Sequence, residues 1–200
     1  MTSQERRAIV LKSKTEGQIV KGKYVDLFPC APDHGATIVK LRNQEKSRSN
    51  LNQVNASTIE SQAAWYSGYM LRGDDIYWCV HNKNGRMIGT VRLYNIDSDG
   101  NCCNQGSFII DEECAMNGPY ALETEILTLD FCFDALCMAK ILNDDKVENK
   151  NMNSISRRIG FQLIQEFERD GARYNLYELT KDTYKRAALA KILAKWKDRE

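Results

Sequence analysis

The chain has 200 residues, 42% hydrophobic and 28% charged, with a formal net charge of +1. This length suits one domain around one hydrophobic core, and the balanced charge excludes the broad positive field of a general nucleic-acid binder. No apolar run is long enough to span a membrane and the first residues lack the apolar core of a signal peptide, so we expect a cytoplasmic protein without membrane insertion.

The cysteines argue against a metal centre. Seven are present, no two are spaced as C-x-x-C, and only His34 and His81 could join them as nitrogen ligands. We therefore expect no bound metal. Reduced and mostly buried thiols in a cytoplasm are the simpler interpretation.

The first quarter of the chain predicts one strand and one helix. Residues 1–21 are polar and lack a period, which indicates a flexible arm or an irregular first strand. Residues 23–30 alternate as a strand does, and residues 33–43 predict a short helix with Asp33 as its N-cap. Residues 45–57 are polar and aperiodic, so we expect a mobile connection.

A second helix is predicted over residues 58–71. Ser57 followed by Glu60 has the spacing of a capping box, and the helix should stop near Gly73. Its apolar face would carry Ile59, Ala63, Tyr66 and Met70.

The middle of the chain predicts three antiparallel strands in succession. Residues 75–83 and 86–97 flank Asn84-Gly85, a signature of a type I′ hairpin in which both central residues have positive φ. Asp99-Gly100 predicts a second turn of this kind before the strand at residues 101–111.

The second half predicts a loop, a long helix, a strand, a short helix and a closing hairpin. These segments are residues 112–121, 122–138, 139–149, 152–160 and 161–184, with the hairpin turning at Asp170-Gly171. The long helix should bury Leu122, Ile126, Leu129, Phe133 and Leu136. The order β-α-α-β-β-β-α-β-α-β-β predicts an α+β fold with a mixed sheet.

The last segment, residues 185–200, predicts a basic amphipathic helix. Its apolar face would carry Leu189, Ile192, Leu193 and Trp196. Such a face packs on its own domain or on a second copy of the chain, as in a homodimer; lying on a membrane surface is the alternative.

The loop at residues 114–121 is a candidate phosphate cradle. It joins a strand to a helix whose first N–H groups have no partner, and Gly118 allows close approach of a ligand. It is not a P-loop, because no lysine or G-K-[ST] sequence follows.

The stretch that carries most information is residues 147–161, "VENKNMNSISRRIGF". Asn149, Met152, Ser156 and Gly160-Phe161 have the spacing N-x-x-(A/S)-x-x-x-Y-x-x-x-G-F, which resembles the GNAT superfamily of acyl-CoA N-acyltransferases. The element order is similar to that family over roughly residues 22–184. The resemblance implies a GNAT-like, mostly antiparallel central sheet flanked by helices, with residues 1–21 as an arm and 185–200 as an appended helix.

The resemblance also implies acetyl-CoA as co-substrate and a set of residues that bind it. The splayed strand would offer the backbone of Phe108, Ile109 and Ile110 to the pantetheine amides. The pyrophosphate would lie on the loop and helix start, formed by Met116, Asn117, Gly118, Pro119, Tyr120 and Ala121. Asn149 would bond the pantetheine arm, and Met152 would pack beside it.

Two departures from the family pattern matter for function. Pro119 stands where the family loop has glycine and removes one N–H donor, although proline suits the first turn of a helix. Ser156 stands where many members have the tyrosine that returns a proton to the thiolate. Serine is a poor general acid at neutral pH, so water or another hydroxyl would take this role.

The implied reaction is direct attack of an amine on the thioester carbonyl, which requires positioning, a deprotonated amine and a polarised carbonyl. Asp111, at the end of a predicted strand, is the first candidate for the general base, with Asp97 and His81 behind it. Ser156 completes the candidate catalytic set.

The amino-terminal half resembles the acetyltransferases that modify amino-sugar nucleotides of bacterial surface glycans. In this resemblance Arg42 and Asn43 end the first helix, and Arg42, Arg48 and Arg92 are candidates for a nucleotide diphosphate. The acceptor would thus be a small-molecule amine, a nucleotide-linked sugar. A ribosomal-protein N-terminal acetyltransferase and a non-catalytic acyl-CoA-binding module stay open as alternatives.

Overall fold

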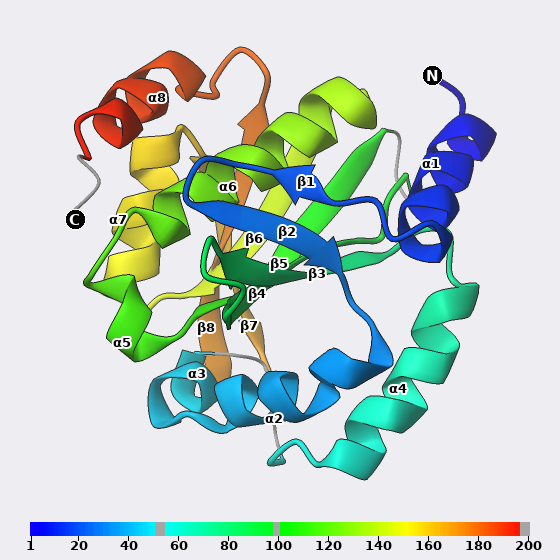
Figure 1. The fold of residues 1–200 in the computed structure, drawn as a ribbon. Coiled ribbons are helices and arrows are strands. Elements are labelled where there is room, and N and C mark those ends of the chain that lie inside the picture. Colours follow the sequence, from blue (N-terminus) through cyan, green and yellow to red (C-terminus); the bar gives the residue numbers. More distant parts are fainter. Residues whose placement is uncertain (51–54, 98–100, 197–200) are drawn as a thin grey trace.

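The computed structural model describes residues 1–50, 55–97 and 101–196, and it is organised around one eight-stranded sheet with helices on both faces (Figure 1). The strand order is β1-β2-β3-β4-β5-β6-β8-β7. Neighbouring strands pair antiparallel except β5 and β6, which run parallel. The predicted α+β class with a mixed, mostly antiparallel sheet is confirmed.

The elements have the following bounds. The strands are β1 Val20–Lys21, β2 Val25–Pro29, β3 Ile76–Asn82, β4 Met87–Tyr94, β5 Cys102–Ile110, β6 Lys140–Lys146, β7 Gln162–Arg169 and β8 Ala172–Thr180. The helices are α1 Ser3–Thr15, η1 Pro32–His34, α2 Gly35–Asn43, α3 Glu45–Asn50, α4 Ile59–Leu71, α5 Glu112–Ala115, α6 Tyr120–Asp130, η2 Phe131–Ala135, α7 Lys150–Ile159 and α8 Arg186–Ala194.

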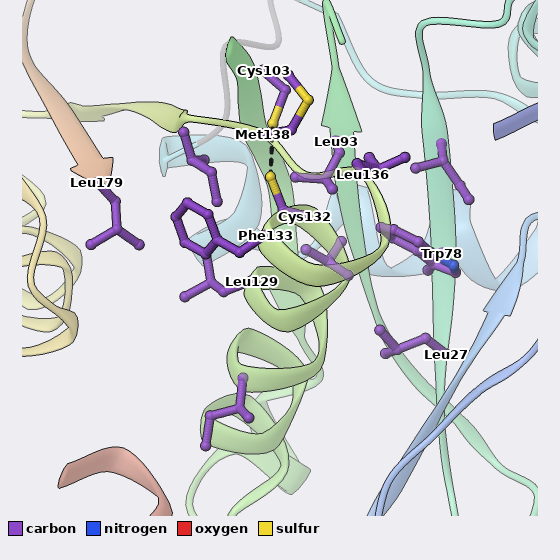
Figure 2. Close-up of a cluster of buried hydrophobic side chains, with 14 of the residues drawn as sticks. Leu27, Trp78, Leu93, Cys103, Leu129, Cys132, Phe133, Leu136, Met138 and Leu179 are labelled. Carbon is purple, nitrogen blue, oxygen red and sulfur yellow. Dashed lines mark hydrogen bonds between the residues drawn. The ribbon is translucent and has the colours of Figure 1, made fainter. Parts of the chain in front are cut away.

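The larger core lies between one face of the sheet and the helix formed by α6 and η2 (Figure 2). The predicted spacing is confirmed for Ile126, Leu129, Phe133 and Leu136, which are all buried in it, whereas Leu122 is half-buried and packs against it. Cys103 and Cys132 belong to this core, with their Sγ atoms 3.3 Å apart. Of the cysteines, Cys114 is half-buried, Cys137 is exposed and the others are buried free thiols.

A smaller core occupies the opposite face of the sheet, under α2 and α4. It consists of Cys30, Ile38, Tyr69, Tyr77 and Cys79. The apolar face predicted for α4 is partly wrong, because Ile59 is 59% exposed and Tyr69 is the buried residue of this helix. Trp65, Tyr66 and Met70 pack against the smaller core from the same helix.

The flexible arm predicted at the amino terminus is wrong. Residues 3–15 form α1, which opens with a capping box between Thr2 and Glu5. Val10 is buried in the larger core, and the Arg6 guanidinium donates to the carbonyl oxygen of Leu136 at 2.8 Å. These contacts, made far along the chain, stabilise a helix whose own sequence is only weakly amphipathic.

The predicted mobile connection and two predicted helix caps are also wrong. Part of the connection forms α3, and its residues 51–54 lie outside the described residues. A 3₁₀ turn, η1, takes up Asp33, so His34 is the N-cap residue of α2. Helix α4 is capped by Thr58, whose Oγ1 accepts from the N–H of Ser61 at 3.1 Å.

The hairpin turns differ from one another. Asp170 and Gly171 have φ of 50° and 72°, which confirms the turn predicted between β7 and β8. At Asn84-Gly85 the predicted hairpin is confirmed, since β3 and β4 pair antiparallel, but the predicted type I′ turn is wrong, because Gly85 has positive φ and Asn84 does not. Asn82 donates its N–H to Arg86 at 3.0 Å, which closes a longer loop. The turn predicted at Asp99-Gly100 lies outside the described residues.

The last helix, α8, packs beside α6 on the larger core. Leu189 is buried and Leu193 is half-buried there, whereas Ile192 is 49% exposed and leaves the predicted apolar face. Across the described part of the chain, no helix has the length and apolar character that a membrane span needs.

Candidate active site

The parallel strands β5 and β6 separate soon after they pair. They pair from Cys102 to Asn104 with Lys140 to Leu142; then β5 follows β4 and β6 follows β8. We call the diverging residues, 105–110 of β5 and 143–146 of β6, the fork. Within it, the backbone groups of β5 that face β6 have no strand partner, so they are available to a ligand.

A β-bulge lies in β5 at the fork. Gly106 pairs with Arg92 and Ile109 with Thr90, so Ser107 and Phe108 together face one residue of β4. Ser107 has a φ of 48°, and its carbonyl oxygen accepts from the Thr90 hydroxyl at 2.8 Å. A bulge bends and twists its strand, which contributes to the divergence of β5 from β6.

A cavity of about 730 Å³ occupies the fork. Its lining near α6 and α7 includes Ala121, Asn149, Met152 and Ile155. Its lining near the smaller core includes Arg42, Ser57, Trp65, Tyr77, Arg92 and Tyr94. Phe108, Ile109 and Ile110 line the same cavity, so both ends belong to one continuous space.

The end of the cavity near α6 has the features of an anion site. The first hydrogen bond of α6 runs from the N–H of Glu123 to the oxygen of Pro119. The N–H groups of Tyr120, Ala121 and Leu122 come before this bond and have no carbonyl partner within the helix. Pro119 is the buried N-cap residue and supplies no donor. Ala121 lines the cavity, but the predicted loop residues before it do not.

The loop itself differs from the extended cradle that was predicted. Residues 112–115 form the short helix α5, and Met116 beyond it is 86% exposed. Asn117 is exposed and its side chain donates to the oxygen of Glu113. A Cβ on Gly118 would lie 2.5 Å from the ring of Tyr120, so the glycine allows this ring to pack closely.

The start of α7 places Asn149 and Met152 at the cavity. Asn149 is the N-cap residue, and its Oδ1 accepts from the N–H of Met152 at 3.2 Å. Together with the unpaired β5 backbone and the start of α6, they form an elongated polar and apolar surface. A long molecule with amides in its arm and a phosphate group at its end fits these residues.

A buried carboxylate reaches the fork from α6. Glu125 is 5% exposed, lines the cavity, and its Oε2 accepts from the side-chain amide of Gln105 at 2.7 Å. Burial raises the pKa of Glu125 to about 7, while the hydrogen bond from Gln105 opposes this shift. Glu125 was missed from sequence, although it stands between Leu122 and Leu129 on the predicted apolar face, where a carboxylate is unusual.

A second carboxylate lies on the β6 side of the fork. The Oδ2 atom of Asp145 accepts from the Ser156 hydroxyl at 2.8 Å and from the Asn143 amide at 3.2 Å. Burial raises the pKa of Asp145, and these two hydrogen bonds act against that rise. Ser156 is 1% exposed and does not line the cavity. This residue, predicted to be catalytic, therefore lies behind Asp145 as seen from the cavity.

The three predicted base candidates do not line the cavity. Asp111 is the N-cap residue of α5, accepts from the N–H of Glu113 at 3.1 Å, and lies 3.5 Å from Arg86. Asp97 forms an ion pair with Arg6 at 3.1 Å. The ring of His81 packs against that of Phe28 in a tilted arrangement, with ring centres 4.6 Å apart.

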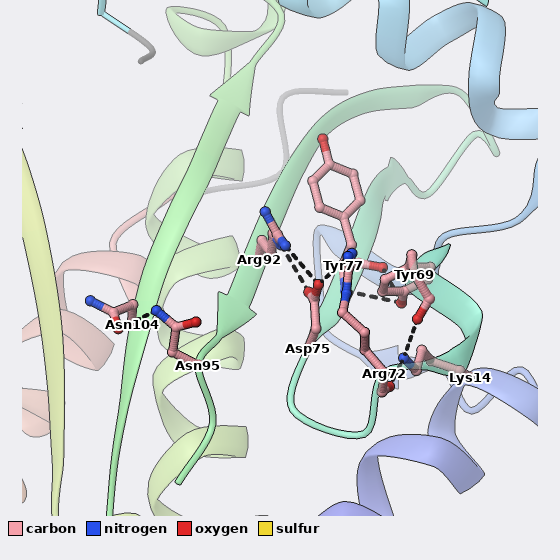
Figure 3. Close-up of polar contacts among 8 residues, drawn as sticks. All are labelled: Lys14, Tyr69, Arg72, Asp75, Tyr77, Arg92, Asn95 and Asn104. Carbon is pink, nitrogen blue, oxygen red and sulfur yellow. Dashed lines mark hydrogen bonds and ion pairs between the residues drawn. The ribbon is translucent and has the colours of Figure 1, made fainter. Parts of the chain in front are cut away.

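The other end of the cavity combines cations with aromatic rings. Arg92 binds both oxygens of Asp75, at 2.8 and 2.6 Å, and Asp75 is shared with Arg72 (Figure 3). The Arg92 guanidinium also lies 5.6 Å from the ring centre of Trp65 and 5.0 Å from that of Tyr94. Trp65, Tyr77 and Tyr94 were not predicted as site residues.

Of the predicted acceptor residues, Arg42 and Arg92 line the cavity and Asn43 does not. Asn43 holds Ser57 instead: its Oδ1 accepts from the Ser57 N–H at 2.9 Å, and its amide donates to the Ser57 oxygen at 2.8 Å. The Arg42 Nε atom lies 3.3 Å from the Ser57 hydroxyl. Arg48 is exposed and away from the cavity.

Comparisons with known proteins agree on one fold. A model of the acetyltransferase (GNAT) domain matches residues 26–162. Similar solved structures include a nucleotide-linked sugar GNAT, FdhC, at 23% identity and a TM-score of 0.74, with 88% of this chain and 98% of that chain covered. A GCN5-related N-acetyltransferase from Brucella melitensis is 22% identical with a TM-score of 0.75, covering 91% of this chain and 88% of that one.

A spermidine N-acetyltransferase from Vibrio cholerae, solved with CoA and spermine, is 18% identical. Its TM-score is 0.74, and the match covers 82% of this chain and 99% of that chain. A comparison with curated protein sequences gives no match. At these identities the solved structures show the fold alone.

Proposed function

Because the chain belongs to the GNAT acetyltransferase family, we propose that it transfers the acetyl group of acetyl-CoA to the primary amine of a nucleotide-linked amino sugar. The single observation behind this proposal is the continuous cavity at the fork. One end offers an unpaired strand edge and a helix start, and the other end offers arginines beside aromatic rings. Two different substrates thus have a place on either side of one reaction point.

We assign the strand edge and the start of α6 to acetyl-CoA. The backbone of Phe108, Ile109 and Ile110 would bond the amides of the pantetheine arm, and Asn149 and Met152 would flank it. The N–H groups at the start of α6, including that of Ala121, would hold the pyrophosphate. Pro119 leaves this site with one donor fewer than a glycine would.

The chemistry at the fork is acyl transfer by direct attack. The amine nitrogen forms a bond to the acetyl carbonyl carbon, the carbon–sulfur bond breaks, and coenzyme A leaves. Binding both substrates in one cavity converts a bimolecular encounter into a positioned reaction, which can supply about 7–11 kcal/mol of the barrier reduction. Backbone N–H groups of β5 can polarise the carbonyl as the charge develops on its oxygen.

The charge of the acceptor end favours an anionic acceptor. Among the described residues, the lining from α2, α3 and α4 includes Arg42 and Lys46 and no carboxylate. This lining would attract a diphosphate and repel a polyamine. Trp65, Tyr77 and Tyr94 offer ring faces for stacking with a planar base or packing against a sugar.

The first experiment measures thermal unfolding with acetyl-CoA, with adenosine diphosphate as the control. A ligand at 100 times its Kd adds about 2.7 kcal/mol to the free energy of unfolding, or roughly 5–10 °C in Tm. We expect a rise specific to acetyl-CoA. No rise at saturation would contradict the assigned site.

The second experiment measures coenzyme A release with three acceptors: a nucleotide-linked amino sugar, spermidine and a peptide with a free α-amine. We expect the nucleotide-linked sugar to give the highest kcat/KM. Preference for the peptide would favour a protein N-terminal acetyltransferase. Binding of acetyl-CoA without turnover of any amine would favour a non-catalytic module.

A further inference from the structure

Glu125 is a buried carboxylate that uses only one of its oxygens within the residues that the structure describes. Its Oε2 accepts from Gln105, the first residue of β5 beyond the last pair with β6. Its Oε1 makes no hydrogen bond within the described part of the chain, and the side chain lines the cavity. A carboxylate oxygen that faces a substrate cavity and lacks a protein donor is available to accept a proton.

The neighbouring carboxylate on α6 is different. Glu123 is also buried, but its oxygens accept from the backbone N–H groups of Lys23, Tyr24 and Val25, at 2.8, 2.5 and 2.7 Å. Glu123 does not line the cavity. It therefore joins α6 to the start of β2 and takes no part at the fork.

Asp145 faces the same cavity but has more donors. The hydroxyl of Ser156 and the amide of Asn143 both bond its Oδ2, and hydrogen bonds to the ionised form make a carboxylate a weaker base. Asp145 also places a negative charge near Glu125, which favours a proton on Glu125. Asp145 is the alternative that an experiment must separate from Glu125.

We infer that Glu125 is the general base of this enzyme, and that its Oε1 removes a proton from the acceptor ammonium at the fork. This inference rests on the proposed acetyl transfer. An amine at the reaction point would lie between the strand edge of β5 and this oxygen. Gln105 would act as a positioning residue, because it holds the other oxygen and fixes the carboxylate.

The proton balance of the step is complete. The ammonium gives one proton to Glu125, and the neutral amine attacks the acetyl carbonyl. As the carbon–sulfur bond breaks, the second proton of the nitrogen goes to the thiolate, through water or a nearby hydroxyl, and gives the thiol of coenzyme A. Glu125 then releases its proton to solvent, so each turnover yields one amide, one thiol and one proton.

The protonation behaviour of Glu125 suits this role. With a pKa of about 7, its carboxylate is partly ionised at neutral pH and is a stronger base than an exposed glutamate. The titratable groups that face it are Asp145 from β6 and Tyr184 from the segment before α8. Gln105, from β5, is neutral.

The test compares the wild-type enzyme with Glu125→Gln over a range of pH. General base catalysis contributes about 10²–10⁴-fold, so we expect kcat/KM for the amine to fall by at least about 100-fold at neutral pH. The loss should shrink as the pH rises, since solution then supplies the free amine. The acid limb that Glu125 gives to the wild-type profile should be replaced by a rise at higher pH that follows deprotonation of the amine itself, and the Tm rise with acetyl-CoA should stay unchanged.

Two further variants make the test specific. Glu123→Gln removes a buried carboxylate from the same helix, and we expect a lower Tm with an unchanged acid limb. Asp145→Asn should keep the acid limb; if that limb disappears in Asp145→Asn and persists in Glu125→Gln, the base is Asp145 and the inference is overturned.

The outcomes also separate this inference from the proposed function. A wild-type chain that turns over while Glu125→Gln keeps its kcat/KM refutes the role of Glu125 alone. A loss that is equal at every pH would indicate a structural role and would also refute it. A wild-type chain that neither binds acetyl-CoA nor acetylates any amine refutes both.

Discussion

Removing the Glu123 carboxylate should destabilise the fold in a way that its position in the sequence does not suggest. Its oxygens hold three backbone N–H groups almost a hundred residues away, at the start of β2. In Glu123→Ala these donors lose their acceptor. An unsatisfied buried group costs about 1–3 kcal/mol, and only Val25 is fully buried, while Lys23 and Tyr24 can reach water.

Together, the three lost hydrogen bonds of Glu123→Ala should lower the free energy of unfolding by about 3 kcal/mol, or Tm by roughly 6–12 °C for a chain of this size. Urea denaturation followed by tryptophan fluorescence would give the free energy, and hydrogen exchange of residues 23–25 would show whether the loss is local. The matched control is Glu113→Ala, whose side chain is 82% exposed and pairs with Arg86 at 3.4 Å. Its cost should stay below about 1 kcal/mol. If the two variants were equally stable, the three hydrogen bonds would contribute nothing and the reasoning would fail.

Three other variants test the site and the backbone. Arg42→Ala should raise KM for a diphosphate-linked acceptor about tenfold with little change in kcat, since a charged hydrogen bond contributes about 1.5–3 kcal/mol; Arg48→Ala, exposed and off the cavity, is its control in steady-state kinetics. Burial raises the pKa of Glu125 from its ordinary value of 4.5 to about 7. Between these two pH values the folded wild-type protein keeps a proton on Glu125 that the unfolded chain has lost. Wild-type stability should therefore fall as pH rises through this window, by up to about 3 kcal/mol, and denaturation of Glu125→Gln should lack this fall. Gly160→Ala should cost at least about 2–3 kcal/mol by thermal denaturation, because φ is +122° and the new Cβ would lie 2.0 Å from a backbone oxygen. Gly171→Ala, with φ of +72° and open space, should cost less.

Local chemistry explains which parts of the fold could be predicted. The turn at Asp170-Gly171 needs two residues with positive φ, and aspartate followed by glycine tolerates this. The apolar spacing of α6 and η2 follows from burial of one helix face. The spacing from Asn149 to Gly160 indicated a family whose model matches residues 26–162. The order of the central elements could therefore be predicted from that family.

Contacts between distant segments explain what could not be predicted. Helix α1 depends on the hydrogen bond from Arg6 to the oxygen of Leu136. Ser57 does not cap α4 as predicted, because Asn43 binds its backbone. Asp111 looked like a base at a strand end, yet the short helix that follows it uses its carboxylate as a cap. Glu125 could have been suspected from its place on an apolar face, but only the fork shows what it faces.

The bulge at Ser107 has a consequence for insertions and deletions. Side chains on a strand alternate between the two faces, and one extra residue changes the phase of that alternation. Before the bulge, Cys103 and Gln105 face α6; after it, Phe108 and Ile110 pack on that side. Deleting Ser107 alone would leave Phe108 and Ile110 on the α6 side, because the remaining residues of β5 would then alternate without interruption, but it would remove the bend that helps β5 diverge from β6. Loss of this one residue should therefore preserve the core contacts of β5 and narrow the fork.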